Sequence, residues 1–468
     1  MINYYTSIGL ETHIELSTST KIFCGCKSSF GSQPNTNCCP ICIGMPGTLP
    51  LLNKKVMQYA MRMGLSLGCN ISSVSYMDRK NYSYPDLAKA YQISQYYVPM
   101  CTDGKFKLSN GNIIRINRIH IEEDAGKIIN DEKNVYIDYN RAGVPLIEIV
   151  TEPDFHSDSE VIEYLEKIRL IAKYLDISDC KMQEGSMRSD VNISVCSSDK
   201  TMGERCEIKN MSSFSNISKA IKYESTRQIK LINSGKIIER ETLGFDESTC
   251  MTYHMRSKEE LNDYRYFKDP DVMPIRISEA EKNAIKTSLP ELPDAKLFRY
   301  INEFKLKETE AKHILKYVNI SKYFEELVKL TDNPKMSASI ILTHIFRIVN
   351  EDSMREEKIA VTPNDTAEVI NLIQSGKILP NFTKKIIDKM FSEGKSFYEL
   401  FDLNDLKPLD NETVLKIITE VIDNNKKIVD SYKSGKTKAL AALMGQTMKK
   451  LNGRADAEQI QKIIVENM

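Results

Sequence analysis

The spacing of hydrophobic residues divides the chain into two parts that differ in character, with the change near Leu292 and Pro293. In the first part, short segments of alternating apolar and polar residues are bounded by turn residues, which is typical of β-strands. Such strands are predicted over 114–126, 134–150, 189–196 and 204–211. Longer segments with apolar residues at three- and four-residue spacing predict helices over 51–67, 159–175 and 217–231.

From about Asp294 onward, almost every segment has the periodicity of an amphipathic helix. One helix is predicted to begin at Thr362 and Pro363, because Thr is a favoured N-cap and Pro fits the first helical position. Another begins near Asp410. We therefore predict an α+β fold with a mixed or antiparallel sheet domain over 1–293, an all-helical domain over 294–407 and a small all-helical tail over 408–468.

The predicted strand over 8–16 has one polar face. Because side chains alternate along a strand, Glu11, His13 and Glu15 project from one side while aliphatic residues occupy the other. Two carboxylates and an imidazole either line a polar cleft or lie on a solvated edge. This strand alone leaves both interpretations open.

Two further segments have similar polar faces. In 118–127, His120 and Glu122 share a strand face, and Glu123 and Asp124 follow at the turn. Consecutive acids are costly to bring together without a positive partner, and Mg²⁺ prefers carboxylate oxygens with an occasional imidazole. Taken singly, each strand fits an ordinary polar sheet face.

In 185–194 the polar residues again alternate to one side, and they are Arg188, Asp190, Asn192 and Ser194. An Asp with an Asn two residues later suits a metal or a ribose, and Arg188 suits a phosphate. Three such strands in one domain predict a shared cleft for Mg²⁺ and ATP.

Eleven cysteines occur in the chain, and four of them form two close pairs. One pair is Cys24 and Cys26, and the other is Cys39 and Cys42. Two close pairs separated by a loop can supply the four thiolates of one tetrahedral Zn²⁺ site. We predict a structural zinc site over 24–42, although Cys38 could replace Cys39. The alternative is a set of small packed thiols without a metal.

A tyrosine-rich segment over 77–97 interleaves five tyrosines with charged residues. It fits either a wall that stacks or positions a nucleotide or a solvated loop. The amino-acid composition of this segment does not distinguish between these two interpretations.

Charge, hydropathy and missing motifs narrow the function. The chain has 64 basic and 64 acidic residues, so nucleic-acid binding would need local basic patches. No apolar run reaches the ~18 residues of a membrane span and no signal peptide is evident, so we expect a cytoplasmic protein that does not contact a membrane. Neither a P-loop nor a GxGxxG motif occurs, and no Gly/Ser-rich amidase signature is found.

Several long motifs, in order and nearly end to end, resemble the B-subunit family of bacterial aspartyl/glutamyl-tRNA(Asn/Gln) amidotransferases, GatB of the GatCAB complex. They are GLETHIEL, FCGC, NCCPICIGMPGTLP, DRKNYSYPDLAKAYQISQY, RIHIEEDAGK, DYNRAGVPLIEIVTEPD, EGSMRSDVNIS, EIKNMSSF, MRSKEELNDYRYFKDPD and GKTKALAALMGQTMKK. The chain departs at Ala88 and Lys268, where the family usually has Pro. Both departures affect local geometry rather than chemistry.

The resemblance implies an ATP-dependent transamidation. ATP phosphorylates the side-chain carboxylate of misacylated Glu-tRNA(Gln) or Asp-tRNA(Asn), and ammonia then displaces the phosphate. Such an enzyme is a carbon–nitrogen ligase with glutamine as amido-nitrogen donor. The implied partners in a heterotrimer are an A subunit that releases ammonia from glutamine and a small C subunit. A non-catalytic tRNA-binding scaffold is the alternative, and the sequence does not decide which tRNA is used.

The resemblance also implies roles for particular residues of the first domain, the catalytic cradle. The implied catalytic residues are Glu11, His13, Glu123 and Asp190, which with Glu122 form the expected Mg²⁺ shell. Arg79 and Lys80 are expected at the phosphate or the ammonia entrance, and Arg188 at the phosphate. Glu15 lies about 13 Å along the strand from Glu11 at ~3.3 Å per residue, so we expect it outside one ion's shell.

For the tail, the resemblance implies a YqeY-like domain that contacts the outer corner of the tRNA. A local basic patch is available there, formed by Lys433, Lys436, Lys438, Lys449, Lys450 and Arg454. A solvated lysine-rich helix face is the alternative for any one of these residues.

Overall fold

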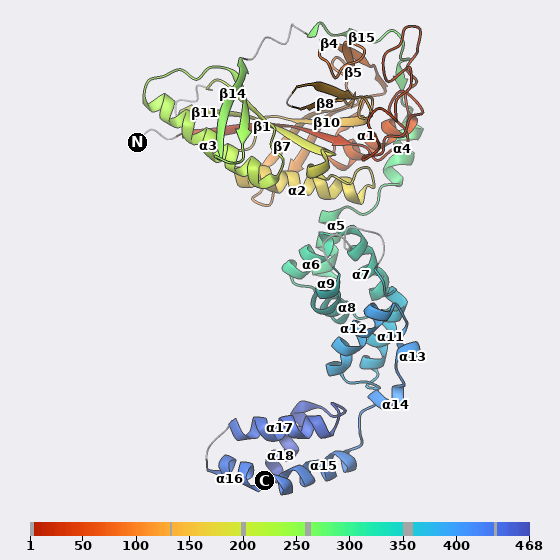
Figure 1. Ribbon diagram of the computed structural model, residues 1–468, viewed down its shortest axis with the longest axis vertical. Coiled ribbons are helices and arrows are strands. Elements are labelled where there is room, and N and C mark those ends of the chain that lie inside the picture. The colour runs from red at the N-terminus through yellow and green to blue at the C-terminus, as the bar shows by residue number, and fades with distance from the viewer. Residues whose placement is uncertain (1–3, 132, 198–202, 258–263, 350–358, 435–437) are drawn as a thin grey trace. The chain divides into compact units, whose positions relative to one another are not determined.

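The computed structural model describes residues 4–131, 133–197, 203–257, 264–349, 359–434 and 438–468. The chain forms two compact units, Met1–Pro293 and Asp294–Met468 (Figure 1). None of the helices within the described ranges is long and apolar enough to cross a membrane.

A nine-stranded sheet organises the first unit, in the order β14-β13-β12-β11-β1-β10-β7-β6-β2. All neighbouring strands are antiparallel except β12 and β13, which are parallel. The strands are β1 (Tyr4–Glu15), β2 (Asn70–Ile71), β6 (Cys101–Lys107), β7 (Ile113–Glu123), β10 (Pro145–Thr151), β11 (Met187–Ser197), β12 (Cys206–Lys209), β13 (Glu241–Asp246) and β14 (Met251–Ser257). The strands predicted from alternation are confirmed, except that the segment 134–150 contributes only its last part, β10, to this sheet.

Smaller sheets accompany the main one, with the orders β15-β4-β5, β16-β3 and β8-β9. Their strands are β3 (Val74–Ser75), β4 (Asp78–Asn81), β5 (Tyr91–Ser94), β8 (Lys127–Asn130), β9 (Val135–Asp138), β15 (Phe267–Lys268) and β16 (Ile275–Arg276). The tyrosine-rich segment forms β4 and β5, so part of it is paired strand rather than loop.

Helices cover one face of the main sheet. These are α1 (Lys54–Ser66), α2 (Asp158–Tyr174) and α3 (Phe214–Asn233), while α4 (Glu279–Thr287) packs against α1. Figure 1 shows α2 and α3 along the same face, and they pack against each other. Their apolar sides, including Val161 and Ile217, are fully buried in one core with strand residues such as Ile8. The three predicted helices are confirmed.

The second unit is helical. Its helices are α5 (Pro293–Asn302), α6 (Glu308–Leu315), α7 (Val318–Thr331), α8 (Pro334–Ile340), a π-helical turn (Ile341–Ile345), α9 (Phe346–Ile348), α11 (Pro363–Gln374), α12 (Thr383–Glu393), α13 (Phe397–Leu400), α14 (Leu403–Leu406), α15 (Asn411–Asn424), α16 (Lys426–Lys433), α17 (Lys438–Lys450) and α18 (Ala457–Glu466). Thr362 caps α11 and Asp410 caps α15, as predicted. The α+β class is confirmed.

Two separate apolar clusters lie within this unit. One includes Val369 and Ile386 of α11 and α12, and the other includes Ile418 and Leu443 of α15 and α17. The expected division between 407 and 408 falls between them but stays a prediction.

Candidate functional site

The polar face of β1 lies beside polar residues of its two neighbouring strands. Glu11 is directly opposite Asp190 of β11, and His13 is opposite Glu148 of β10. Glu148 is in turn opposite His120 of β7. Directly opposed residues point to the same side of a sheet, so these side chains share one face. Buried Ile8, Leu10 and Ile14 lie on the other face and anchor the strand.

Three acidic side chains gather at Glu11, Asp190 and Glu207, which we call the carboxylate group. One oxygen of each lies within 4.8 Å of the others. Lys209 contacts Asp190, and its Nζ lies 3.2 Å from Glu207 Oε1. Asn192 Nδ2 donates to Glu11 Oε1 at 2.9 Å, while its buried Oδ1 has no hydrogen-bond partner within the described part of the chain.

Burial raises the pKa of Glu11, and the neighbouring Glu148, Glu207 and Asp190 raise it further. The group therefore has more negative charge than Lys209 alone can balance. Oxygen donors at this spacing fit a hard divalent cation such as Mg²⁺.

A second cluster on the same face is the histidine group, formed by His13, His120, Glu122 and Glu148. Ligand atoms of His13, Glu122 and Glu148 lie within 4.8 Å of one another. Glu148 Oε2 lies 3.4 Å from His13 Nε2 and 3.1 Å from His120 Nε2. One buried carboxylate thus fixes both rings.

Charges within the histidine group stabilise each other. Burial alone would lower the pKa of His120, but Glu148 and Glu122 raise it to about 9. Burial would likewise raise the pKa of Glu122, yet Lys80 and His120 lower it to about 2. His120 and Glu122 therefore each favour the charged form of the other.

Lys80 and Arg79 follow each other on β4 but make different contacts. Lys80 Nζ lies 5.0 Å from the ring centroid of Tyr264, and Glu122 raises its pKa despite burial. Arg79 instead donates from Nε to Asp269 at 2.7 Å and from Nη2 to Asp271 at 2.7 Å. The structure thus brings Lys80 toward the histidine group and pairs Arg79 elsewhere.

Glu123 has different neighbours from Glu122. Lys89 Nζ donates to its two oxygens at 2.5 and 2.7 Å, and the backbone N–H of Ile93 donates to Oε1 at 2.8 Å. Because β7 continues through Glu123, this side chain points away from Glu122. The predicted Mg²⁺ shell is therefore divided among the carboxylate group, the histidine group and the Lys89–Glu123 pair.

Arg188 and Glu15 meet at the end of β1. Arg188 Nη2 donates to Asp124 Oδ2 at 2.8 Å. Burial and the nearby Asp124 raise the pKa of Glu15 to about 8.

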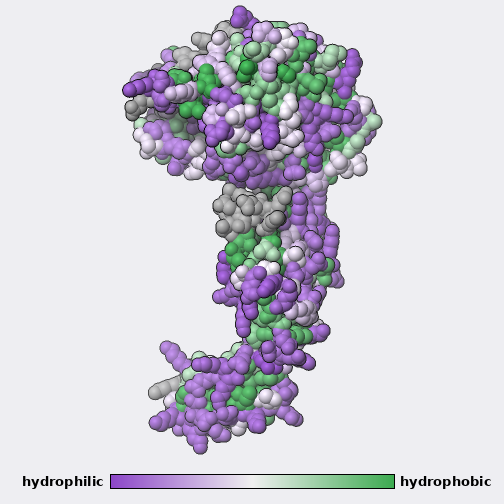
Figure 2. Space-filling view, turned by 45° about the vertical axis from the view of Figure 1, so that its right-hand side comes forward, coloured by the Kyte–Doolittle hydropathy of each residue, from purple (hydrophilic) through white to green (hydrophobic). Residues whose placement is uncertain are grey.

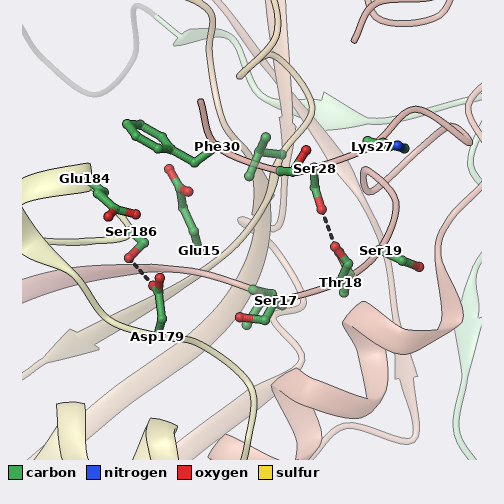
Figure 3. A pocket seen from close by; sticks show the side chains of 13 residues that line it. Glu15, Ser17, Thr18, Ser19, Lys27, Ser28, Phe30, Asp179, Glu184 and Ser186 are labelled. Carbon is green, nitrogen blue, oxygen red and sulfur yellow. Dashed lines mark hydrogen bonds between the residues drawn. The ribbon is translucent and has the colours of Figure 1, made fainter. Parts of the chain in front are cut away.

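Beyond Glu15 lies a pocket of about 390 Å³ (Figure 3). Figure 3 shows Glu15, Glu184 and Phe30 on one side and Lys27 and Ser19 on the other. Glu11, His13, Glu123 and Asp190 do not line this pocket.

The four predicted zinc ligands converge. One sulfur each from Cys24, Cys26, Cys39 and Cys42 lies within 4.8 Å of the others. Cys42 Sγ is 3.5 Å from Cys24 Sγ and 3.7 Å from Cys39 Sγ. Zn–S bonds of about 2.3 Å in a tetrahedron place sulfurs about 3.8 Å apart, so the donor set fits Zn²⁺.

Cys38 is placed apart from that set, with its sulfur 3.8 Å from Asn140 Oδ1. This arrangement favours Cys39 over Cys38 as a metal ligand.

Comparisons with known proteins find relatives that match over the length of the chain. The family model described as GatB/GatE catalytic domain matches residues 6–283, and the one described as GatB domain matches residues 322–468. The B subunit of the aspartyl/glutamyl-tRNA(Asn/Gln) amidotransferase of Thermoanaerobacter sp. (strain X514) is 45% identical over 473 residues, covering 100% of both chains. The chain belongs to the GatB family.

Other GatB relatives are similar over the same length. The corresponding protein of Caldicellulosiruptor saccharolyticus is 45% identical, covering 100% of this chain and 99% of that protein. That of Clostridium tetani is 43% identical, with the same coverage. The resemblance seen in the motifs is therefore confirmed.

The basic residues of the GatB tail have mixed surroundings. Lys450 Nζ pairs with Glu420 Oε1 at 2.7 Å, and Arg454 Nε donates to the Lys407 carbonyl at 2.8 Å. Lys433, Lys438 and Lys449 form no ion pair with a carboxylate of the described residues. Lys436 lies outside the described residues. Figure 2 shows mostly hydrophilic residues over the tail surface.

Sequence reasoning did not assign Glu148, Glu207 or Lys209 to the predicted site. Glu148 is a single acid within the apolar run of β10, and an isolated charge in a buried strand is a signal that could have found it. Glu207 and Lys209 lie two residues apart on β12, so they share one face of that strand. Because β12 has only four residues, the sequence around it does not indicate that it pairs with β11.

Proposed function

We propose that this chain carries the kinase and transamidase site of a tRNA-dependent amidotransferase. In this proposal ATP phosphorylates the side-chain carboxylate of misacylated Glu-tRNA(Gln) or Asp-tRNA(Asn), and ammonia converts the acyl phosphate to an amide. The observation that carries the proposal is the placement of the carboxylate group and the histidine group on one face, on five adjacent strands of one sheet. Family membership supports the overall reaction.

The carboxylate group would hold Mg²⁺. Glu11, Asp190 and Glu207 supply anionic oxygens, and the unpartnered Oδ1 of Asn192 supplies a neutral one. Bound Mg²⁺ supplies positive charge to the phosphate oxygens as the phosphoryl group moves. Glu207 and Asn192 extend the predicted shell.

The histidine group would orient the substrate beside this shell. Glu148 holds His13 and His120, so neither ring needs to reorganise during the reaction. Lys80 lowers the pKa of Glu122, so its positive charge lies on the same side of the sheet as the histidine group. A carboxylate substrate and a triphosphate repel each other, and such cations offset that repulsion. His13 and Glu122 remain proposed Mg²⁺ ligands.

Phosphate contact is assigned to Lys80 and Arg188 rather than Arg79. Two aspartates already hold the Arg79 guanidinium, whereas Arg188 makes one short contact with Asp124 and is about a third exposed. Arg79 is therefore proposed to brace β4. Glu123 is proposed to act together with Lys89, either at the metal or along the ammonia route.

Amide formation requires ammonia that bulk water would otherwise protonate or dilute. We infer a glutaminase A subunit that delivers it by a protected path and a small C subunit that completes a cytoplasmic heterotrimer. The tail over 408–468 is proposed to bind the tRNA through its basic residues.

The test uses the assembled heterotrimer with Asp190→Asn and Glu207→Gln, each of which replaces a carboxylate with a neutral amide. We expect tRNA-dependent ATP cleavage to fall about 100-fold or more, because each change removes charge that holds the cation at the phosphates. Glu163→Gln on α2 is the matched control, since Glu163 bonds Ser109 on the helix-covered side. Retained cleavage in both variants would refute the proposed kinase site.

A further inference from the structure

Lys21 is a fully buried lysine beside the four cysteines. It follows β1, and its side chain has 0% exposure. Nζ lies 3.5 Å from Cys42 Sγ and donates to the Tyr139 carbonyl at 3.2 Å. Lysine is almost never fully buried unless its charge is paired.

The partners of Lys21 are unusual for a buried ammonium. Within the described ranges, no carboxylate forms an ion pair with it, and the nearby Glu123 is already bonded to Lys89. A carbonyl and a neutral thiol supply a hydrogen bond but no opposite charge. An uncompensated charge in the interior is strongly destabilising.

Thiolates would supply the missing charge. Four cysteine thiolates on one divalent ion leave a net charge of about −2 on the centre. The Lys21 ammonium, 3.5 Å from one of those sulfurs, would then be paired with a negative charge. The zinc centre would in turn be paired with a positive charge.

We propose that Lys21 is the counter-charge and positioning residue of a four-thiolate zinc centre. This proposal does not depend on the ATP site. It separates the two interpretations of the cysteines, because packed neutral thiols would leave Lys21 without a counter-charge.

Lys21 also connects both cysteine pairs. Its backbone N–H donates to the Cys26 carbonyl at 2.9 Å, while its side chain reaches Cys42 of the second pair. The same ammonium donates to the carbonyl of Tyr139, which is the residue that follows β9. Lys21 therefore fixes the first pair through its backbone and the second through its charge.

Gly143 lies directly against the Lys21 side chain. A Cβ at Gly143 would lie 3.6 Å from Lys21 Cδ and 3.9 Å from Glu123 Oε2. The zinc loop and the Glu123 region of the reaction face thus pack against the same backbone segment.

The test compares Lys21→Met and Lys21→Arg with the unchanged chain in the purified heterotrimer. Zinc content is measured by elemental analysis, and zinc release to an excess of chelator is followed in time. Loss of an outer partner of a metal ligand weakens metal affinity about 10- to 100-fold. We expect that weakening and faster release in Lys21→Met, with most of the retention restored in Lys21→Arg.

Cobalt substitution adds a readout that packing alone would not change. We expect the sulfur-to-cobalt charge-transfer band to shift in Lys21→Met and to return toward its original position in Lys21→Arg, because the nearby positive charge stabilises the sulfur electrons.

The matched control is Lys296→Met, which removes a buried lysine of the second unit that pairs with Glu325. It should lower the melting temperature while zinc release stays unchanged.

If Lys21→Met does not fold, Lys21→Gln removes the charge but keeps a donor for Tyr139 and gives the same comparison. Zinc affinity, release and cobalt spectrum equal to those of the unchanged chain in the folded neutral variant would overturn the proposal. A chain that binds neither Zn²⁺ nor Co²⁺ would overturn it as well.

Discussion

Asn192 joins two features of the carboxylate group in a single side chain. Its amide nitrogen fixes Glu11, and its carbonyl oxygen is buried without a partner among the described residues. A buried acceptor left unpaired costs about 1–3 kcal/mol. A cation within the group would offset that cost, so this residue is a sensitive probe of metal binding.

We predict that Asn192→Ala raises the Mg²⁺ concentration for half-maximal tRNA-dependent ATP cleavage about 10-fold, because the change removes both a proposed oxygen ligand and the amide that fixes Glu11. Titration of Mg²⁺ with the assembled complex measures this. Asn117→Ala is the control, because Asn117 donates to Glu152 Oε1 at 2.7 Å on the same sheet but outside both groups. An unchanged Mg²⁺ dependence in Asn192→Ala would exclude a role in holding the cation.

The directions of individual side chains could be predicted from the sequence in some places and not in others. Alternation along β1 and β11 correctly placed Glu11, His13 and Asp190 on one face. The resemblance, however, implied that the consecutive residues Glu122 and Glu123 belong to one Mg²⁺ shell. The strand continues through Glu123, so its side chain points to the other side, where Lys89 binds it.

Among the helices, the carboxylate of Glu325 on α7 bridges two cations of α5. Its Oε1 accepts from Lys296 Nζ at 2.5 Å and also contacts Arg299. Burial would raise the pKa of Glu325, but these two cations lower it below its ordinary value of 4.5. A lowered carboxylate pKa adds stability above the unfolded value and loses it as the pH falls through the folded value.

We therefore predict that Glu325→Gln lowers the free energy of unfolding by about 1–3 kcal/mol at pH 7. The difference from the unchanged chain should shrink as the pH falls below 4.5, because the carboxyl group is protonated first in the unfolded chain and then, at lower pH, in the folded one. Calorimetry of both chains from pH 7 to pH 3.5 measures it. Glu393→Gln, at an exposed position of α12, is a control expected to change little. A difference that is independent of pH would contradict this explanation.

Element order explains why the complete site was not visible in the sequence. Helix periodicity and strand alternation predicted the elements themselves, including the Thr362 and Asp410 caps. The sheet places β1 between β10 and β11, which are distant in sequence from it. Nothing local specifies that pairing, so the neighbours that bring Glu148 and Glu207 to the site could not be identified from local patterns.

At the scale of the whole molecule, a chain with no net charge would need local basic patches for the proposed tRNA binding. Lys450 and Arg454 already have partners in the tail, whereas Lys433, Lys438 and Lys449 pair with no carboxylate of the described residues. These three lysines are therefore the better candidates for phosphate contacts.

We predict that Lys433→Glu with Lys449→Glu weakens tRNA binding and lowers the slope of log affinity against log salt by about 1 for each lysine. ATP cleavage at saturating tRNA should be preserved. Filter binding across salt concentrations gives the slope, and Lys222→Glu on the exposed side of α3 is the control. An unchanged slope would remove these lysines from the tRNA surface.

The central claim is that this subunit joins the substrate carboxylate to phosphate before amide formation. The most direct measurement starts from misacylated tRNA whose Glu or Asp side-chain carboxylate contains ¹⁸O, with ATP, glutamine and the assembled heterotrimer. One carboxylate oxygen should leave with the phosphate when ammonia adds, so mass spectrometry should find one ¹⁸O in the inorganic phosphate. Phosphate that contains no ¹⁸O, alongside normal formation of the amide, would contradict the proposed function.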